Sequence, residues 1–487
     1  MTSMNASQPM NVLLILADDL RFDTIGARGR LPVQTPNLDQ LMARGTMFTR
    51  AHLMGSSHGA VCMPSRAMLH TGRTLYHLEE AGGCIPPTHT MLGEHLRQAG
   101  YDTWGCGKWH SDKASFQRSF ADGDEIFFGG MTDHWNVPAF RYDSSGAYDA
   151  TLPQCPTPLG NNDVKWRPCD HIHAGRHSSE VFADASIRFL ESRQASPTPW
   201  FMSVATLAPH DPRVMPERFR QLYDPNAIEL PPNFLPMHPF DTGDLAGRDE
   251  KLAGFPRTEA EVRRHIAEYY GIISHLDHEL GRIFDALEAS GQDQNTLVIM
   301  TADHGLAVGQ HGLMGKQNLY DHSVRVPLLM AGPGVPANQQ VDELCYLIDV
   351  FPTICELLGL DVPATVQGES LAPCLNDPST RVREVLHLAY RHLMRGVTDG
   401  KHKLIEYVMD DHRRTQLFDL EHDPWETTDR SSDPANAALL KRLRREMLRW
   451  RDEFNDNWPT QGGVFWQGYA PDEAPGIACH RQPAPAT

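Results

Sequence analysis

The chain has 487 residues, and its 62 acidic side chains outnumber its 44 lysines and arginines, which gives a formal net charge of −18 with histidines neutral. This charge argues against a general nucleic-acid binder, because phosphate contacts need clustered positive charge. Hydrophobic residues make up 40% and charged residues 22%, as in a protein with a large core rather than a disordered one. The length predicts one large domain with a smaller one.

The early sequence has no segment typical of a membrane span or a secretory signal. The apolar run Val12–Ala17 is too short to cross a bilayer, and no lysine or arginine precedes it. We therefore expect a cytoplasmic protein with no membrane partner. The cysteines show no CxxC pair or regular spacing, which predicts buried thiols rather than a disulfide scaffold or a zinc ribbon. They stand at positions 62, 84, 106, 155, 169, 345, 355, 374 and 479.

Three apolar runs, Val12–Ala17, Phe201–Ala205 and Thr296–Thr301, predict buried strands of a parallel sheet. Polar residues follow each run, and ligands of open α/β sheets bind beyond the carboxyl ends of the strands. We therefore expect these polar side chains to meet at one edge of the sheet. They are Asp18, Asp19, His210, Asp303 and His304.

Helices are predicted at residues 37–44, 91–99 and 258–290, and each is followed by a glycine that ends it. Thr258–Glu261 has the pattern of a capping box at the start of the longest helix. The fold class expected from this alternation is α/β, with a large mixed, mainly parallel sheet flanked by helices. Residues 111–177 show little periodicity, which predicts a long functional loop at the rim of a site.

The pattern changes from about Val382 to short strands, at 402–407 and 416–420, and then to a basic helix near 437–451. This order predicts a smaller C-terminal α+β subdomain with an antiparallel sheet. The expected division is a large domain at 1–380, the subdomain at 381–470 and a poorly ordered tail at 471–487.

The most informative segment is Cys62-Met-Pro-Ser65-Arg66, followed by Thr71-Gly72-Arg73 and later by Gly107-Lys108-Trp109-His110. It resembles the signature of the type I (formylglycine-dependent) sulfatases, members of the alkaline-phosphatase-like superfamily. Seven matching residue types within twelve positions make a chance match negligible. The resemblance continues through residues 11–19, 35–38, 209–212, 303–305, 315–316, 325–328 and 417–424.

The resemblance implies hydrolysis of a sulfate monoester to an alcohol and inorganic sulfate, after a formylglycine-generating enzyme has oxidised Cys62. A captured sulfuryl group on a thiol or serine would be released slowly. An aldehyde hydrate instead carries two hydroxyls on one carbon, so that one attacks sulfur and the other expels sulfate. Taken alone, Cys62 would be interpreted as a buried apolar thiol.

The resemblance also implies a metal site made of Asp18, Asp19, Asp303, His304 and the modified Cys62. Three carboxylates favour Ca²⁺ first and Mg²⁺ second, whereas the nitrogen of His304 leaves room for Mn²⁺ or Zn²⁺. Many sulfatases have asparagine where this chain has His304. Outside the resemblance, Asp18 and Asp19 could be a solvated strand end or a helix cap.

The remaining catalytic residues follow from the same resemblance. Arg66 is expected to hold the formylglycine hydrate, and Lys108 and Lys316 to bind sulfate, with His110 beside the nucleophile. His210 is expected to protonate the departing alkoxide, a role that suits an imidazole near neutral pH. Either lysine could instead be a solvated surface charge.

Substrate contacts are expected from aromatic and cationic groups of the rim, which suit a carbohydrate sulfate or an aryl sulfate, although the same groups could be loop packing. The cluster between Cys169 and His177 raises a zinc hypothesis. Its spacing matches no structural zinc site, and Ser178-Ser179 predicts a helix cap, so we favour rim residues over a second metal. The substrate candidates are His134, Trp135, Arg141, His171, His173 and His311.

Three alternatives stay open at this point. A phosphodiesterase or phosphonate monoester hydrolase shares the superfamily, but Ser65 favours a sulfatase over the Pro-Ala-Arg variant common in that group. A non-catalytic protein that binds sulfated glycans would leave Cys62 unmodified. A two-zinc phosphatase is disfavoured because no second set of histidines and aspartates is found. The exact ester and the oligomeric state are not predicted.

Overall fold

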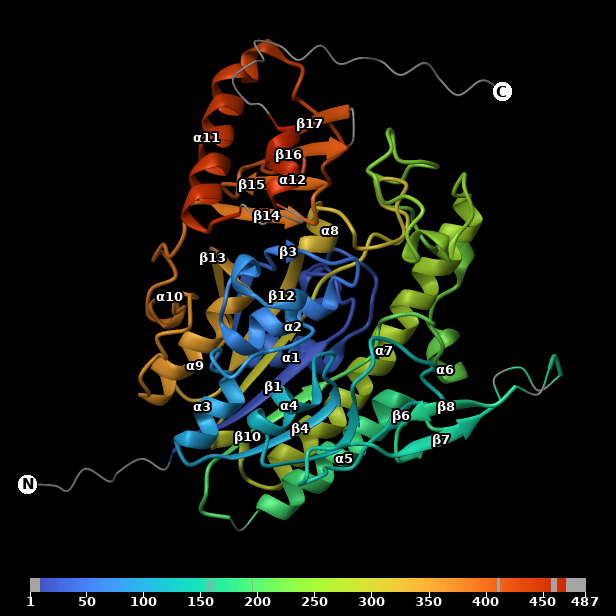
Figure 1. Cartoon of the computed structure of the whole chain (residues 1–487), viewed down its shortest axis with the longest axis vertical. Helices are drawn as coiled ribbons and strands as arrows, with labels where there is room; N and C mark the ends of the chain where they lie inside the picture. The colour runs from blue at the N-terminus through green and yellow to red at the C-terminus, as the bar shows by residue number, and fades with distance from the viewer. Residues whose placement is uncertain are drawn as a thin grey trace, which may run out of the picture.

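The structure is a computed structural model that describes residues 9–155, 157, 159–161, 163–194, 196–409, 412–456 and 462–469. Its centre is an eight-stranded sheet in the order β13-β2-β12-β11-β1-β10-β4-β5 (Figure 1). Neighbouring strands are parallel, except that β12 is antiparallel to both of its neighbours, β11 and β2. This confirms the mixed, mainly parallel sheet. The strands are β1 (Asn11–Ala17), β2 (Thr46–His52), β4 (Asp102–Lys108), β5 (Asp122–Phe127), β10 (Trp200–Ala205), β11 (Thr296–Ala302), β12 (Arg325–Ala331) and β13 (Gln339–Tyr346).

The three apolar runs of the sequence form the middle of this sheet. Strand β1 lies between β11 and β10, with Leu14 opposite Ile299 on one side and Ser203 on the other. All residues of the three strands are buried, because helices cover both faces of the sheet. The three carboxyl ends therefore lie side by side, as the pattern of parallel strands requires.

Helix α7 is the longest described helix and packs against α1, α5 and α6, whereas α2 packs against α3 and α9. Thr258 starts α7 by accepting a hydrogen bond from the Glu261 amide, and Gly291 follows its end with a φ of 70°. The helices are α1 (Pro36–Arg44), α2 (Cys62–Thr71), α3 (Leu92–Gln98), α4 (Lys113–Ser119), α5 (Ser178–Arg193), α6 (Glu217–Arg220), α7 (Glu259–Ala289), α8 (Asp321–Val324), α9 (Val350–Leu358), α10 (Ala372–Asn376), α11 (Ala437–Glu453) and α12 (Gly462–Gly468).

The second sheet has the order β17-β16-β15-β14-β3, and its four C-terminal strands are antiparallel, as predicted. Helices α11 and α12 pack on it (Figure 1). The fifth strand, β3 (Gly55–Ser56), comes from the N-terminal part of the chain and pairs in parallel with β14. The strands are β14 (Leu386–Tyr390), β15 (Met394–Thr398), β16 (His402–Met409) and β17 (His412–Asp419). The boundary at residue 380 stays a prediction, and the tail at 471–487 lies outside the described residues.

Residues 111–177 depart from the predicted loop. They contain α4 and the edge strand β5, and β5 pairs with β4 through a register shift. They also contain the paired strands β6 (Pro138–Ala139) and β9 (His171–Ile172), and the hairpin of β7 (Thr151–Gln154) and β8 (Lys165–Pro168), which projects from the body (Figure 1). These strands are short and contain many polar residues and prolines, so they lack the apolar alternation that reveals a strand.

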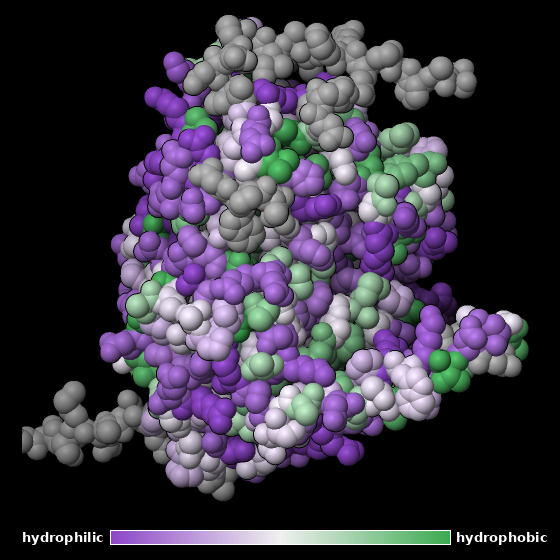
Figure 2. Space-filling model, viewed as in Figure 1, coloured by the Kyte–Doolittle hydropathy of each residue, from purple (hydrophilic) through white to green (hydrophobic). Residues whose placement is uncertain are grey.

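Among the described residues, no helix is long and apolar enough to cross a bilayer. Figure 2 shows a mainly hydrophilic face on which hydrophobic residues are scattered. The eight cysteines that the structure describes are free thiols, of which Cys84 and Cys155 are partly exposed and the others are buried. Cys479 lies outside the described residues.

Candidate active site

The carboxyl ends of β1 and β11 place four side chains next to one another. Asp18 and Asp19 follow β1, Asp303 and His304 follow β11, and all four are fully buried. The two strands are in register, with Ala17 opposite Ala302. Asp19 has a φ of 66°, which is uncommon for a residue other than glycine and often marks a functional position.

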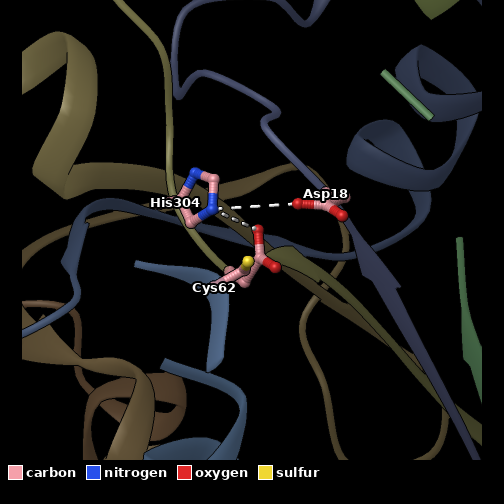
Figure 3. A group of neighbouring side chains, drawn as sticks. Asp18, Cys62 and His304 are labelled. Atoms are coloured by element: carbon pink, nitrogen blue, oxygen red, sulfur yellow. Dashed lines mark ion pairs between the residues drawn. The ribbon is translucent and has the colours of Figure 1, made fainter. Parts of the chain in front are cut away.

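His304 lies among the three carboxylates. Its Nδ1 is 3.0 Å from Asp19 Oδ1, and its Nε2 is 3.5 Å from Asp303 Oδ1 and 3.7 Å from Asp18 Oδ1. Figure 3 shows the imidazole ring of His304 facing Asp18, with Cys62 beside the ring. Burial lowers the pKa of His304, but Asp303 and Asp19 outweigh burial and raise that pKa to about 10.

Three cationic side chains compensate the buried carboxylates. Lys108 Nζ lies 2.5 Å from Asp18, Lys316 Nζ lies 2.8 Å from Asp19, and Arg66 Nε lies 2.8 Å from Asp303. Burial alone would raise the carboxyl pKa values. The neighbouring cations nevertheless hold the pKa of Asp18 and of Asp19 below its ordinary value, whereas burial and the charge of Asp18 raise the pKa of Asp303.

Cys62 is the first residue of α2, and its side chain is almost fully buried. Its Sγ lies 3.2 Å from His110 Nδ1. Burial raises the pKa of the thiol, but Lys108 and His110 outweigh burial and hold the pKa well below its ordinary value. Arg66, one helical turn further on, donates to the Lys108 carbonyl at 2.7 Å, so that α2 is fixed to the end of β4. A thiol pKa lowered by neighbouring positive groups is typical of a reactive cysteine.

His210 follows β10 and faces the same edge. Its Nδ1 lies 2.8 Å from the carbonyl oxygen of Asp211, and its Nε2 lies 3.9 Å from Asp19 Oδ2. Because a carbonyl only accepts, Nδ1 carries a proton and Nε2 is the atom directed toward Asp19.

Three further charged residues belong to this edge and were not singled out from the sequence. Arg248 pairs with Asp211 through both guanidinium nitrogens, and Asp249 lies 3.7 Å from Lys316. Asp211 could have been found from the sequence, because it directly follows His210. Arg248 and Asp249 fall in an irregular stretch that offers no pattern.

Several buried polar atoms of the site lack a hydrogen-bond partner among the described residues. They are Asp18 Oδ1, Asp19 Oδ2, Arg66 Nη2 and His304 Nε2. Unpartnered buried polar atoms are costly, and they are expected where a ligand completes the site. Asp18, Cys62, Asp303 and His304 also place one ligand atom each within 4.8 Å of one another. This donor set has two carboxylates, Asp19 adjoins it as a third, and carboxylate oxygens favour a hard divalent cation.

The expected rim residues are distributed over different environments. His134 is buried, with its Nε2 3.0 Å from the His210 carbonyl oxygen and its ring stacked on His177. His311 is also buried, and its ring stacks on Tyr320 with centroids 3.8 Å apart. Trp135 is half-buried and Arg141 is exposed.

His171 and His173 both contact Glu125. The helix cap predicted at Ser178-Ser179 is displaced by one residue. His177 is the N-cap of α5 and accepts from the Ser179 amide, because an imidazole nitrogen can also cap a helix.

Two family models match the chain. The model of the sulfatase family matches residues 10–360, and the model described as N-sulphoglucosamine sulphohydrolase, C-terminal, matches residues 309–453. The chain belongs to the sulfatase family. This membership makes it a sulfuric ester hydrolase with an alkaline-phosphatase-like fold, as the cysteine motif predicted.

The relatives of this sulfatase extend over nearly its whole length. It is 29% identical to the multifunctional alkaline phosphatase superfamily protein PehA of Trinickia caryophylli, over 91% of this chain and 95% of that one. It is 25% identical to an arylsulfatase of Clostridium perfringens, over 94% and 98%. A structure solved in complex with its substrate, D-glucosamine-2-N,6-O-disulfate, has a TM-score of 0.74 at 19% identity and covers 93% of this chain and 99% of its own.

Proposed function

We propose that this sulfatase hydrolyses a sulfate monoester of a carbohydrate, through a formylglycine made from Cys62. The observation that carries the proposal is the position of Cys62 at the start of α2, 3.2 Å from His110 and beside the buried set of Asp18, Asp303 and His304. The family model named after N-sulphoglucosamine sulphohydrolase and the disulfated glucosamine of the structural neighbour support a sugar sulfate.

Two groups would complete the site. Oxidation of Cys62 to formylglycine would supply an aldehyde hydrate, with one hydroxyl to attack sulfur and a second to expel sulfate. A divalent cation held by Asp18, Asp19, Asp303 and His304, Ca²⁺ first and Mg²⁺ or Mn²⁺ next, would neutralise sulfate oxygens and favour deprotonation of the attacking hydroxyl.

The chain's own cations bind and orient the ester. Lys108 contacts Asp18, and Lys316 contacts Asp19 and Asp249. An ammonium group has three donors, so each lysine can bind a sulfate oxygen without losing these contacts. Arg66 and the amides at the start of α2 add further donors for an anion. These buried positive charges act in a site with little water, where their effect on developing negative charge is large.

His210 gives its proton to the departing alkoxide. The contact of its Nδ1 with the Asp211 carbonyl fixes the ring, so that Nε2 is the nitrogen that faces the site. Asp19 Oδ2 lies 3.9 Å from Nε2, on the side of the ring that faces the site.

The experiment is sulfate release from defined sulfated mono- and disaccharides and from an aryl sulfate, together with the mass of the proteolytic peptide that contains Cys62. We expect turnover of at least one sugar sulfate, a peptide in which the thiol is replaced by an aldehyde, and loss of turnover in Cys62→Ala. Unchanged turnover in Cys62→Ala, or an intact thiol in fully active protein, overturns the proposal.

A second candidate is a phosphonate monoester or phosphate diester hydrolase, because a phosphonate monoester hydrolase of Agrobacterium radiobacter has a similar fold, with a TM-score of 0.72 over 91% of this chain. Ser65 does not decide between the two, since its hydroxyl donates to the Asp303 carbonyl at 2.6 Å and has a structural role in either case. Parallel assays with an aryl sulfate and an aryl phosphate diester separate them. A much larger kcat/KM for the diester would favour the second candidate.

A further inference from the structure

A second cluster of residues of metal-binding types lies outside the catalytic site, within the predicted rim segment 111–177. His171 Nε2 lies 2.8 Å from Glu125 Oε2, and His173 Nε2 lies 2.8 Å from Glu125 Oε1. The three side chains each offer one ligand atom within 4.8 Å of the others. The histidines alone did not reveal this cluster in the sequence, because Glu125 is 46 residues away.

A bulge in the edge strand β5 positions Glu125. Cys106 of β4 pairs with Asp124, and the next pair is Gly107 with Ile126, so that Glu125 is an extra residue without a partner in the ladder. Its φ is 52°. Bulges of this kind redirect a side chain, and here the carboxylate is turned toward the short strand β9. Glu125 is buried, whereas the histidines keep a path to solvent.

A second carboxylate orients one of the histidines. Asp170 accepts a hydrogen bond from His171 Nδ1, and the backbone amide of Arg141 donates to the other Asp170 oxygen at 2.9 Å. His171 Nε2 is thereby directed at Glu125. A histidine that binds a metal through one nitrogen usually donates from the other nitrogen to a carboxylate or carbonyl, and His171 has this arrangement.

We propose that Glu125, His171 and His173 form a second metal site, for a divalent transition ion of the zinc class. Two imidazole nitrogens and one carboxylate are ligands typical of Zn²⁺, whereas Ca²⁺ and Mg²⁺ prefer oxygen alone. The site has three protein ligands, and a water would take the fourth tetrahedral position.

The position of the site connects it with the support of the catalytic centre. The His173 carbonyl accepts from the Arg176 amide, and Gly175 donates to the carbonyl of Trp135 at 2.9 Å. Trp135 adjoins His134, whose Nε2 contacts the carbonyl of His210. A cation would therefore hold this segment on the edge of the main sheet and stabilise the structure behind His210. The inference does not depend on the proposed substrate.

The test measures metal binding by the full-length protein after a chelator has removed its metals. Isothermal titration calorimetry measures the binding of Zn²⁺, and the visible spectrum of the protein with Co²⁺ reports the coordination geometry. The double variant Asp18→Asn/Asp19→Asn removes the catalytic cation site, so that any remaining equivalent of zinc belongs elsewhere. We expect one equivalent to remain in this variant, with a tetrahedral Co²⁺ spectrum and a rise in Tm on addition of zinc.

The added changes His171→Ala/His173→Ala are expected to weaken zinc binding by at least about a hundredfold, since loss of ligands removes most of the site. The matched control is His402→Ala/His422→Ala, because these two histidines also contact carboxylates but lie in the second sheet and the turn after it. The control is expected to bind zinc unchanged.

Glu125→Gln gives a test that does not depend on removing both rings. It keeps the size of the side chain. We expect the variant to have the far-ultraviolet circular dichroism spectrum of the folded protein and to bind zinc more weakly. Zinc binding that survives both Glu125→Gln and His171→Ala/His173→Ala, or no zinc equivalent in Asp18→Asn/Asp19→Asn, overturns the proposal and leaves an ion-pair cluster.

Discussion

At the scale of single residues, the candidate active site is an arrangement of buried charge. Removing an ion from water costs several kcal/mol, and here three carboxylates are fully buried. Lys108, Lys316 and Arg66 offset this cost by contacts of 2.5–2.8 Å. Asp18 Oδ1 and Asp19 Oδ2 still lack partners among the described residues, so the charge balance is incomplete without a cation.

Removal of divalent cations is therefore expected to lower stability as well as activity. Addition of Ca²⁺ at a hundred times its Kd stabilises a protein that binds it only when folded by about 2.7 kcal/mol. We expect Ca²⁺ to raise the Tm of the chelator-treated protein and to have little effect on Asp19→Asn. The control is Asp285→Asn, at an exposed position of α7, which keeps the full shift. An equal rise in both variants would contradict the assignment of the site.

The role of His210 leads to a prediction about leaving groups. If His210 protonates the alkoxide, His210→Asn lowers kcat for a sugar sulfate by about 10²–10⁴. The loss is expected to be much smaller for 4-nitrophenyl sulfate, because a nitrophenolate leaves without a proton. Steady-state kinetics on both esters measure the difference. The same loss for both esters would mean that His210 positions the substrate rather than acting as the acid.

At the scale of the elements, the end of β4 shows why a glycine precedes Lys108. Gly107 has a φ of 85°, and a Cβ at this position would lie 2.0 Å from the Ala205 carbonyl oxygen of β10. The register between β4 and β5 also shifts next to Gly107. The close approach of β4 and β10 at Gly107 sets the direction in which Lys108 leaves the sheet.

Gly107→Ala is expected to lower the free energy of unfolding by at least about 2 kcal/mol, from the left-handed conformation and the clash together. Denaturant unfolding measures the loss. Gly291→Ala separates the two causes, because Gly291 has a φ of 70° but nothing within 4 Å of its added Cβ, and we expect about 1–2 kcal/mol there. Equal losses in the two variants would mean that the contact with Ala205 relaxes.

At the scale of the whole molecule, the two sheets are joined through buried polar groups. Lys403 of β16 contacts Asp321 of α8 and lies 2.8 Å from Glu426, and all three side chains are buried. His311, from the loop after β11, donates from Nε2 to the Glu426 carbonyl oxygen at 2.9 Å. Burial lowers the pKa of His311 to about 3, so the ring stays neutral in the folded protein.

A neutral buried histidine makes stability depend on pH. The unfolded chain takes up a proton at His311 below about pH 6.5, whereas the folded protein does not until about pH 3, so stability falls as the pH decreases through this window. We expect His311→Gln to make this decrease shallower, by up to about 1.4 kcal/mol for each pH unit. Urea unfolding between pH 7 and pH 5 measures the slope. The exposed His422→Gln is the control, and an unchanged slope in His311→Gln would contradict the expectation.

Much of this arrangement follows from local sequence signals. The apolar runs around Leu14, Met202 and Ile299 predict neighbouring buried strands because a sheet covered on both faces needs continuous apolar sequence. The cysteine motif predicts the family. Strand β5 and its bulge were not predictable, because pairing with β4 and not the composition of residues 122–127 makes that segment a strand.

The sequence by itself determined the residue types of the site and the strand ends that carry them, because periodicity and motif spacing are local properties of a chain. Only the tertiary structure decided which groups meet. It placed Arg248 on Asp211, buried His134 behind His210, and brought Glu125 to His171 and His173. Such contacts join segments far apart in the chain, and their geometry comes from packing and strand pairing, which no single segment encodes.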